Sequence, residues 1–551
     1  MRPIPLVDPR HTTVHARHTT VIVGICLAVL LAGCSGGSES GQTSSSSPGK
    51  SSSKAIPTFT FALASAPVSL DIAKNYVTTT MQMISLVTEP LERVSSTGQV
   101  SPNLATAVSQ PNATTLVYTI RSGVKFSDGT PLTAKDVAWS IKHVTSPPAQ
   151  TAGDVGNIGS VKVTGPLQVT VKLTKPDPAT RAKLAVITYV QEAKFAKAHA
   201  KELGTRTALP VGTGPYKFSS DTTSAVTLAA NPHYWGKRPS ARKVVFTFID
   251  NDTSAQLAMR SGSIDGTLIS DPKAIQQWKS IDGATLYETP SLESTYIALN
   301  TSIAPFNDPH VRKAFAYSID RTGLLKAAFG NNGAVLHGLV PAGVISDVAP
   351  STSAAKSFLK SLPGYDFSPT KAAAELAQSK HPKGFTVTVP YISSTPFTKL
   401  TALNLQQNMQ KLGVKINLKS QTQNQWLTSV YGQKNPGAQF MTIVADVPDP
   451  NGLLSLVVGK ANTAPQHFNT TNWTTPQIET ALPVMESSSS NGARWKATKT
   501  ILSQIAGDAA YIPLFSPDNA TVLAKGYTFT NDGNLFTLIN GSWIFDLKAS
   551  R

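Results

Sequence analysis

An apolar run followed by a loop rich in aspartate and proline is the segment of this sequence best suited to polar chemistry. Residues 441–451 read Met-Thr-Ile-Val-Ala-Asp-Val-Pro-Asp-Pro-Asn, so Asp446 and Asp449 directly follow a predicted apolar strand. A carboxylate in a water-poor cleft can pair with an ammonium group and accept its hydrogen bonds. The simpler alternative is that both aspartates only cap a turn, which is the commoner outcome for such a loop.

Sequence motifs for catalysis are weak elsewhere in the chain. Residues 51–54 form a Ser-x-x-Lys string inside a serine-rich tract, where such matches arise by chance. Residues 212–217 start like a dinucleotide-binding loop, but Lys217 stands where the third glycine belongs and Pro215 interrupts the helix start. These residues are better interpreted as the start of a strand at a crossing between lobes. Since no carboxylate pair can be singled out either, we predict that the protein is not an enzyme.

The histidines and cysteines predict neither a metal site nor a cofactor. Histidines 11, 15 and 18 have metal-like spacing but lie in a segment that we expect to be removed, and the other seven are scattered without a His-Glu-x-x-His or Cys/His cluster. The two cysteines, Cys26 and Cys34, are too few for a disulfide framework. We therefore expect no metal and no cofactor.

The elements that must position these side chains are those of a mixed α/β protein. Helices are predicted after Thr133, where Asp136 completes a capping box, and after Asp308, where a proline opens the first turn. A third helix is predicted for residues 400–412, with its apolar face at Leu400, Leu403, Leu405, Met409 and Leu412 and its end at Gly413. Strands are predicted at residues 116–121, 385–389 and 414–418.

The composition is that of a folded protein with more than one domain. The chain has 551 residues, of which 40% are hydrophobic and 15% charged. Its formal net charge of +17 is spread thinly, without the Lys/Arg runs of a nucleic-acid-binding arm. We therefore expect no nucleic acid partner and interpret the charge as a solvated basic surface.

The N-terminus has the features of an export signal and a lipid anchor. Residues 21–32 are free of charge and follow a segment with three arginines, but as a helix they would span only about 18 Å, too short to cross a membrane. Residues 31–34, Leu-Ala-Gly-Cys, resemble the bacterial lipobox, which implies removal of residues 1–33 and lipidation of Cys34. A Ser/Gly-rich tether is predicted for residues 34–54. We expect an extracytoplasmic protein that is lipid-anchored to the cell membrane.

A series of motifs in the body of the chain resembles family 5 of the extracellular solute-binding proteins, the dipeptide, oligopeptide and nickel receptors of ABC importers. The matching segments appear in the family's order over essentially the whole mature chain. They are residues 88–94, 101–105, 118–137, 212–216, 231–235, 256–265, 298–300, 308–321 and 511–514.

This resemblance implies an α/β fold with two lobes, the clamshell of periplasmic binding proteins of the large cluster C type, with an extra inserted domain. The implied lobe I comprises residues 55–88, 213–292 and 510–548, the inserted domain residues 89–212, and lobe II residues 293–509. The implied function is that of a monomeric substrate-binding lipoprotein, which captures short peptides between its lobes and delivers them to the permease subunits of an ABC importer. Several crossings between lobes restrict their motion to a hinge closure.

The resemblance also implies ligand-binding residues. In peptide-binding members an Asp four residues before a proline pairs with the ligand's α-ammonium, which corresponds to Asp446 here, with Asp449 as the second choice. Ser65, in the turn after the first strand, corresponds to a ligand-facing loop. Tyr391 and Trp426 could supply apolar walls, or could pack in the core or between the lobes.

Other ligands and functions are compatible with the same sequence. The fold could bind a metal chelate, haem, an oligosaccharide or another amine-bearing solute in place of a peptide. An envelope hydrolase with an atypical site, or an adhesin or sensor that uses the same clamshell, are further alternatives. No clear matches are found for basic residues that would pair with a peptide's C-terminal carboxylate, so the preferred peptide length stays open.

Overall fold

A computed structural model describes residues 51–52, 54–153, 155–465 and 467–550 of the chain. The predicted signal peptide, Cys34 and all but a few residues of the predicted tether therefore lie outside the described residues. Among the residues described, no helix has both the length and the apolar character needed to cross a membrane.

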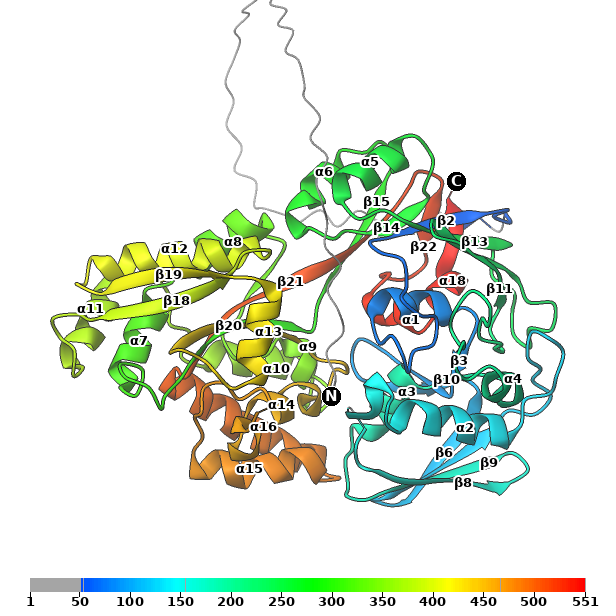
Figure 1. Cartoon of the computed structure of the whole chain (residues 1–551), viewed down its shortest axis with the longest axis horizontal. Coiled ribbons are helices and arrows are strands. Elements are labelled where there is room, and N and C mark those ends of the chain that lie inside the picture. The colour runs from blue at the N-terminus through cyan, green and yellow to red at the C-terminus, as the bar shows by residue number, and fades with distance from the viewer. Residues whose placement is uncertain (1–50, 53, 154, 466, 551) are drawn as a thin grey trace, which may run out of the picture. The chain divides into compact units, whose positions relative to one another are not determined.

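Lobe I is built on a sheet with parallel strands at its centre (Figure 1). Strand β2 (Phe59–Leu63) lies between β13 (Lys243–Phe248) and β14 (Gly266–Leu268) and runs parallel to both. Alternation along β2 divides its side chains between two cores. Phe59 and Phe61 pack with Trp543, whereas Ala62 faces a smaller cluster around Trp278.

Lobe II contains the second half of the same sheet, flanked by helices. Strand β16 (Glu293–Leu299) pairs antiparallel with β20 (Ala438–Val444) over its whole length. Strands β18 (Thr386–Ile392) and β19 (Lys415–Gln421) form a parallel pair beside them. A core of apolar side chains that includes Phe306, Phe315 and Phe440 fills the space between these strands and the helices of this lobe.

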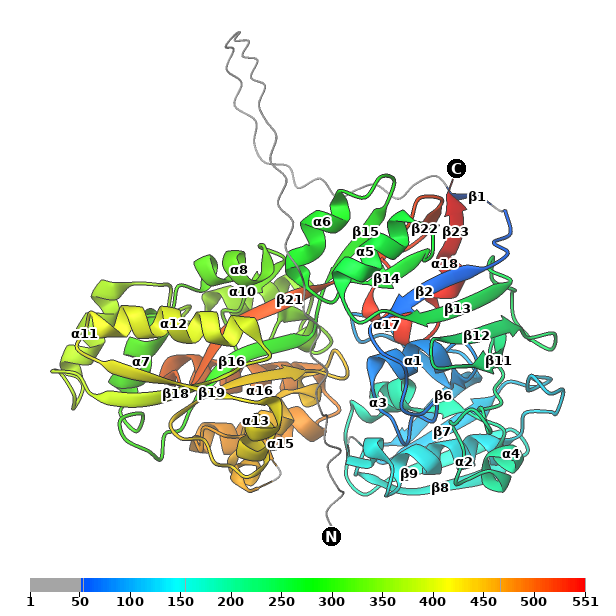
Figure 2. The ribbon, with the colours of Figure 1, turned by 45° about the horizontal axis from the view of Figure 1, so that its top comes forward.

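Strand β21 (Tyr511–Leu523) joins the two lobes (Figures 1 and 2). Its first part pairs with β16 and β17 (Gly333–Val335) of lobe II, and its last part pairs with β14 and β15 (Thr285–Pro290) of lobe I. The chain crosses back between β15 and β16, where the Ser291 and Ser516 hydroxyl oxygens lie 3.3 Å apart. Two neighbouring crossings therefore connect the lobes.

The inserted domain is a four-stranded antiparallel sheet covered by helices (Figure 2). Its strand order is β6-β7-β9-β8, and Leu116, Tyr118 and Ile120 of β7 point into its core. Its main elements are β6 (Ala105–Asn112), β7 (Thr115–Ile120), α2 (Ala134–Thr145), β8 (Ile158–Gly165), β9 (Gln168–Leu173), α3 (Thr180–Ile187) and α4 (Ala193–Ala198). The residue-by-residue lobe boundaries given above stay a prediction.

The remaining elements complete these three parts. In chain order they are β1 (Ser51–Ser52), α1 (Thr78–Ile84), β3 (Glu89–Pro90), β4 (Glu92–Val94), β5 (Val100–Pro102), η1 (Gln150–Gly153), β10 (Tyr189–Val190), β11 (Tyr216–Asp221), β12 (Ala225–Ala230), α5 (Asp252–Arg260), η2 (Pro272–Ala274), α6 (Ile275–Lys279), α7 (Pro309–Tyr317), α8 (Arg321–Phe329), α9 (Ala342–Ile345), α10 (Thr352–Ser361), α11 (Pro369–Gln378), α12 (Pro396–Gln410), α13 (Gln423–Tyr431), η3 (Pro450–Gly452), α14 (Leu454–Val457), η4 (Lys460–Thr463), α15 (Pro476–Ser487), α16 (Asn491–Asp508), β22 (Tyr527–Phe529), α17 (Leu535–Ile539), α18 (Trp543–Asp546) and β23 (Leu547–Ser550).

Local sequence signals predicted several of these elements. The capping box of Thr133 and Asp136 opens α2, and Asp308 caps α7 ahead of its first-turn proline. The apolar face predicted for α12 is partly wrong, because Leu405 and Met409 are buried while Leu400 and Leu403 are exposed to 38% and 41%. Both lie on the face of the helix turned away from the lobe II core.

The glycines of residues 212–216 allow the chain to pass close to itself between lobe I and the inserted domain. The Gly214 amide donates to Val87 O and the Tyr216 amide to Leu86 O, so this segment pairs with the chain that enters the inserted domain. A Cβ at Gly212 would overlap Val87 O and lie 2.7 Å from Thr88 Cα. The segment then leads into β11, which agrees with the predicted strand start and not with a phosphate-binding loop. The crossing here joins the inserted domain to lobe I, not one lobe to the other as predicted.

We predict that Gly212→Ala lowers the free energy of unfolding by about 1–3 kcal/mol, because the added methyl must displace the backbone of residues 87 and 88. Gly507→Ala is the matched control, since a Cβ at this exposed position in α16 meets nothing within 4 Å. The control should raise the free energy of unfolding by about 0.5–1 kcal/mol, because alanine is favoured over glycine inside a helix. Urea denaturation followed by circular dichroism measures both, and equal effects of the two changes would contradict the close-approach explanation.

Candidate functional site

The carboxyl ends of strands from both lobes meet at the two crossings. Strand β14 pairs antiparallel with β21 from Leu523 back to Thr521, so β14 and the parallel strands β2 and β13 all run toward the crossing. In lobe II, Val444 at the end of β20 pairs with Glu293 at the start of β16, and the Ala445 amide donates to Leu292 O (3.2 Å). The loops that leave these strand ends form the candidate site, since ligands of open α/β sheets bind beyond the carboxyl ends of strands.

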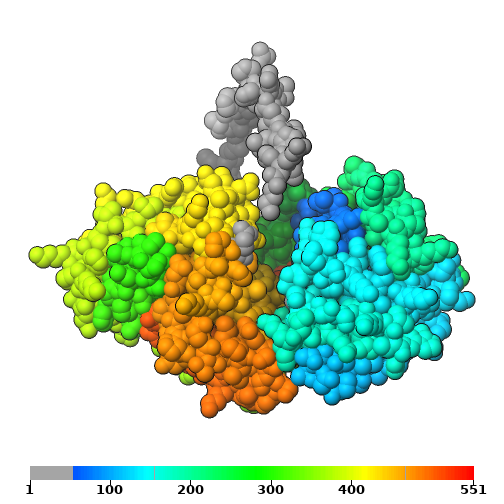
Figure 3. All heavy atoms as spheres, turned by 60° about the horizontal axis from the view of Figure 1, so that its bottom comes forward, coloured from blue at the N-terminus to red at the C-terminus, as the bar shows by residue number. Residues whose placement is uncertain are grey.

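The surface is hollowed between the lobes. On the face drawn in Figure 3, a recess separates the yellow and orange residues of lobe II from the blue and cyan residues opposite. The loop after β20 belongs to the first group and the loop after β2 to the second.

Ser65 lies in the loop that follows β2. It is exposed, as are its neighbours Ala64 and Ala66. Val68 in the same loop is 90% exposed, which is unusual for so apolar a side chain and leaves a methyl surface available to a ligand. The loop thus combines short polar and apolar side chains at the carboxyl edge of the lobe I sheet.

Asp446 is exposed and lies two residues beyond the end of β20. Val444, the last residue of that strand, is 49% exposed. The local fold explains why the loop turns here. Asp449 Oδ1 accepts a hydrogen bond from the Asn451 amide at the start of η3, and a Cβ at Gly452 would lie 2.8 Å from Val447 O.

Asp449 differs from Asp446 in that its carboxylate is buried against protein groups. Arg494 Nη2 of α16 lies 2.6 Å from Asp449 Oδ1, and both side chains are almost fully buried. Arg494 Nε also donates to Met485 O (2.8 Å), which fixes the guanidinium in place. The Asp449 carboxylate therefore caps η3 and neutralises a buried arginine. These contacts correspond to the alternative in which the aspartate caps a turn.

Tyr391 and Trp426 both pack against the strands of lobe II. Tyr391 lies within β18, not after it as predicted, because the strand continues to Ile392 in register with β19. Its ring is half-buried against the lobe II core. Trp426 of α13 is half-buried as well and donates from Nε1 to Phe440 O of β20 (2.7 Å). These contacts hold α13 on the strand that leads to Asp446.

Sequence reasoning missed Glu293 at the start of β16. Burial raises the pKa of Glu293, and a hydrogen bond from Thr295 Oγ1 (3.2 Å) partly offsets that rise. Thr295 in turn pairs with Thr442 of β20 across the sheet, with hydroxyl oxygens 3.3 Å apart. No sequence signal could have found this group, because only the strand register brings residues 293–295 beside residues 442–444.

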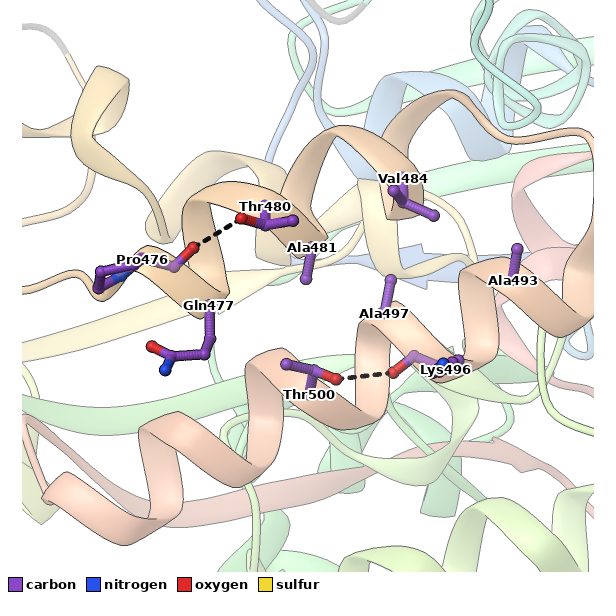
Figure 4. A pocket seen from close by; sticks show the side chains of 9 residues that line it. All are labelled: Pro476, Gln477, Thr480, Ala481, Val484, Ala493, Lys496, Ala497 and Thr500. Atoms are coloured by element: carbon purple, nitrogen blue, oxygen red, sulfur yellow. Dashed lines mark hydrogen bonds between the residues drawn. The ribbon is translucent and has the colours of Figure 1, made fainter.

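Two further cavities lie away from the candidate site. A groove of about 580 Å³ separates α15 and α16, and Figure 4 labels the nine residues that line it, among them Val484 and Lys496. A polar cavity of about 630 Å³ lies beside the start of α5, and Asp252 and Asp271 are among the residues that line it. Neither is lined by a predicted ligand-binding residue. No group of three or more histidine, cysteine or acidic side chains among the described residues could hold a metal ion.

Comparisons with known proteins give the same class of receptor. The family of bacterial extracellular solute-binding proteins, family 5 middle region, matches residues 99–465. The glutathione-binding protein GsiB of Salmonella typhimurium is 26% identical over 425 residues, which are 75% of this chain and 80% of GsiB. The probable D,D-dipeptide-binding periplasmic protein DdpA of Escherichia coli K12 is 28% identical over 316 residues, or 55% of this chain and 57% of DdpA.

A solved structure shows the same fold. The periplasmic binding protein DppA from Helicobacter pylori, in complex with the peptide STSA, superposes with a TM-score of 0.71 at 20% identity, covering 91% of this chain and 99% of DppA. The two-lobed clamshell predicted from the sequence is therefore confirmed. Together with the family match over most of the chain, these findings identify the protein as a member of family 5 of the bacterial extracellular solute-binding proteins, a family of receptors and not of enzymes.

Proposed function

We propose that this protein captures short peptides with a free α-amino group in the cleft between its lobes and delivers them to the permease of an ABC importer. The observation that carries the proposal is the position of Asp446, an exposed carboxylate directly beyond the strand β20 that ends at the lobe crossing. The relatives named for glutathione and D,D-dipeptides support a ligand of this size and chemistry.

The surroundings of Asp446 suit a peptide N-terminus. An ammonium that enters a closing cleft loses its water, and this is costly unless a carboxylate replaces the lost hydrogen bonds. Val444 in lobe II and Val68 in lobe I offer apolar surface for side chains. Loops at strand ends also present backbone amides and carbonyls, with which an extended peptide can pair independently of its sequence. Ser65 is the proposed contact from lobe I.

The other predicted residues take indirect roles in this proposal. Trp426 and Tyr391 hold the lobe II wall in place through the contacts described above, and Asp449 supports the loop from below. We further propose that Cys34 carries a lipid anchor, that residues 1–33 are removed on export, and that the receptor acts as a monomer at the outer face of the cell membrane.

One prediction from the proposed function concerns the ligand's amino group. Asp446→Ala should weaken binding of a free-amine peptide by about 2–5 kcal/mol, because the ammonium loses its carboxylate partner inside the closed cleft. Native mass spectrometry of the protein, purified without denaturant and offered a mixed peptide library, first identifies a bound peptide, and isothermal titration calorimetry then measures its affinity. N-acetylation of that peptide should reproduce the loss.

The matched control is Asp282→Ala, which removes a carboxylate that is 91% exposed on lobe I and pairs with Lys525 at the surface. It should leave the affinity unchanged. Equal affinity of wild type and Asp446→Ala for a peptide that binds would remove Asp446 from the site. Retention of a sugar, haem or metal chelate with no peptide would keep the receptor and overturn the proposed ligand.

A further prediction separates the two aspartates of the loop. Arg494→Leu leaves the Asp449 carboxylate buried without its counter-ion and should lower the free energy of unfolding by about 3–5 kcal/mol. Asp446→Asn, at an exposed site, should change it by less than about 0.5 kcal/mol. Urea unfolding curves measure both. An Arg494→Leu protein as stable as wild type would show that the buried pair does not support the loop.

A further inference from the structure

The loop that carries Asp446 also reaches across to the inserted domain. Asn451 lies five residues after Asp446, and its Nδ2 donates to Asp177 Oδ1 at 3.0 Å. Asp177 belongs to the turn between β9 and α3, and 274 residues separate the two in the sequence. Both side chains are largely covered, since Asn451 is 4% exposed and the Asp177 side chain 11%.

Each side of this contact is held by its own part of the molecule. Asp177 Oδ1 also accepts from the Ala179 amide (2.9 Å), and Asp177 Oδ2 lies 3.1 Å from Lys183 Nζ of α3. Asn451 Nδ2 also donates to Glu486 O (3.0 Å), and its amide donates to Asp449 Oδ1 (2.8 Å). The buried Asp449–Arg494 pair therefore holds Asn451 in place on the lobe II side of the contact.

The inserted domain and lobe II also come close to each other at two further places near this hydrogen bond. Burial raises the pKa of Glu486 at the end of α15. Of the charged groups of the inserted domain, Lys175 and Lys183 lower this pKa and Asp177 raises it, so the two parts interact electrostatically here. Gly98, in the turn between β4 and β5, approaches Asp347 so closely that a Cβ there would lie 3.0 Å from Asp347 Cβ. Orange and cyan spheres meet at this rim of the recess in Figure 3.

We propose that Asp177 and Asn451 form a latch, which holds the inserted domain against lobe II when the cleft is closed and so controls how long a ligand stays bound. The latch rests on the proposed function only in that a ligand occupies the cleft behind it. Its position on the Asp446 loop gives the mechanism, because a ligand that draws this loop toward the opposite side of the cleft also brings Asn451 to Asp177.

The latch is built to release. Both hydrogen atoms of the Asn451 amide are used, but its Oδ1 is buried and has no hydrogen-bond partner among the described residues. A buried acceptor without a partner disfavours the closed arrangement, and opening restores its water. The closed state therefore gains a charge-assisted hydrogen bond and loses the hydration of one amide oxygen, which leaves a small net preference.

The test needs no ligand, so its failure is distinguishable from a failure of the proposed function. Hydrogen–deuterium exchange of the full chain is compared for wild type, Asp177→Ala and Asn451→Ala. Asp177→Ala should raise the exchange rate of lobe II amides in residues 450–458 about tenfold, and Asn451→Ala should do the same for residues 175–183 of the inserted domain. The double variant should exchange no faster than the faster single variant, because both changes remove one interaction.

Asp128→Ala is the matched control. Asp128 also lies in the inserted domain and accepts from the amide two residues on (Thr130 N, 2.9 Å), but it is exposed. It should change exchange only in its own turn. Effects of Asp177→Ala and Asn451→Ala that stay on the substituted side, or that add in the double variant, would overturn the latch. If either single variant fails to fold, the other tests the same contact from the opposite side.

Discussion

Strand β21 carries the constraint on which the rest of the structure depends. It is a single run of backbone that pairs with lobe II strands over its first part and with lobe I strands over its last part. A rigid strand of this kind would lock the lobes together, but Pro513 and Pro517 remove two backbone donors from it. The β21 ladder is therefore weakened on the lobe II side, up to the crossing where Ser516 meets Ser291.

The position of the candidate site follows from the arrangement of the strands around β21. Strand β2 pairs with β14 and strand β20 pairs with β16, the two neighbours of β21, and both end near the crossing. The loops after β2 and β20 therefore approach the same recess from opposite lobes. In lobe II the loop is fixed by the buried ion pair between Arg494 and Asp449. Asp446, which lies closer to β20, stays exposed. An exposed carboxylate and a buried, paired one thus lie three residues apart.

Structural features that depend on a few neighbouring residues could be predicted from the sequence. The caps at Thr133 and Asp308 and the strand before Asp446 are of this kind, and the ordered motifs of the family gave the two-lobed fold. Contacts between distant residues could not be predicted, as with Asp449 and Arg494 or Asp177 and Asn451. Apolar periodicity likewise could not tell that Leu400 and Leu403 face outward, because both fit a helical repeat.

The path of β21 also determines the order in which the two lobes can complete their sheets as the chain is made. The lobe II strands have their β21 partner once residue 517 has left the ribosome or the export channel. Strands β14 and β15 of lobe I still lack the strand they pair with until residues 518–523 follow. The central sheet of lobe I therefore waits with an unpaired edge while almost the whole chain passes. Until residues 518–523 arrive, this edge is open to pairing with a strand of another chain.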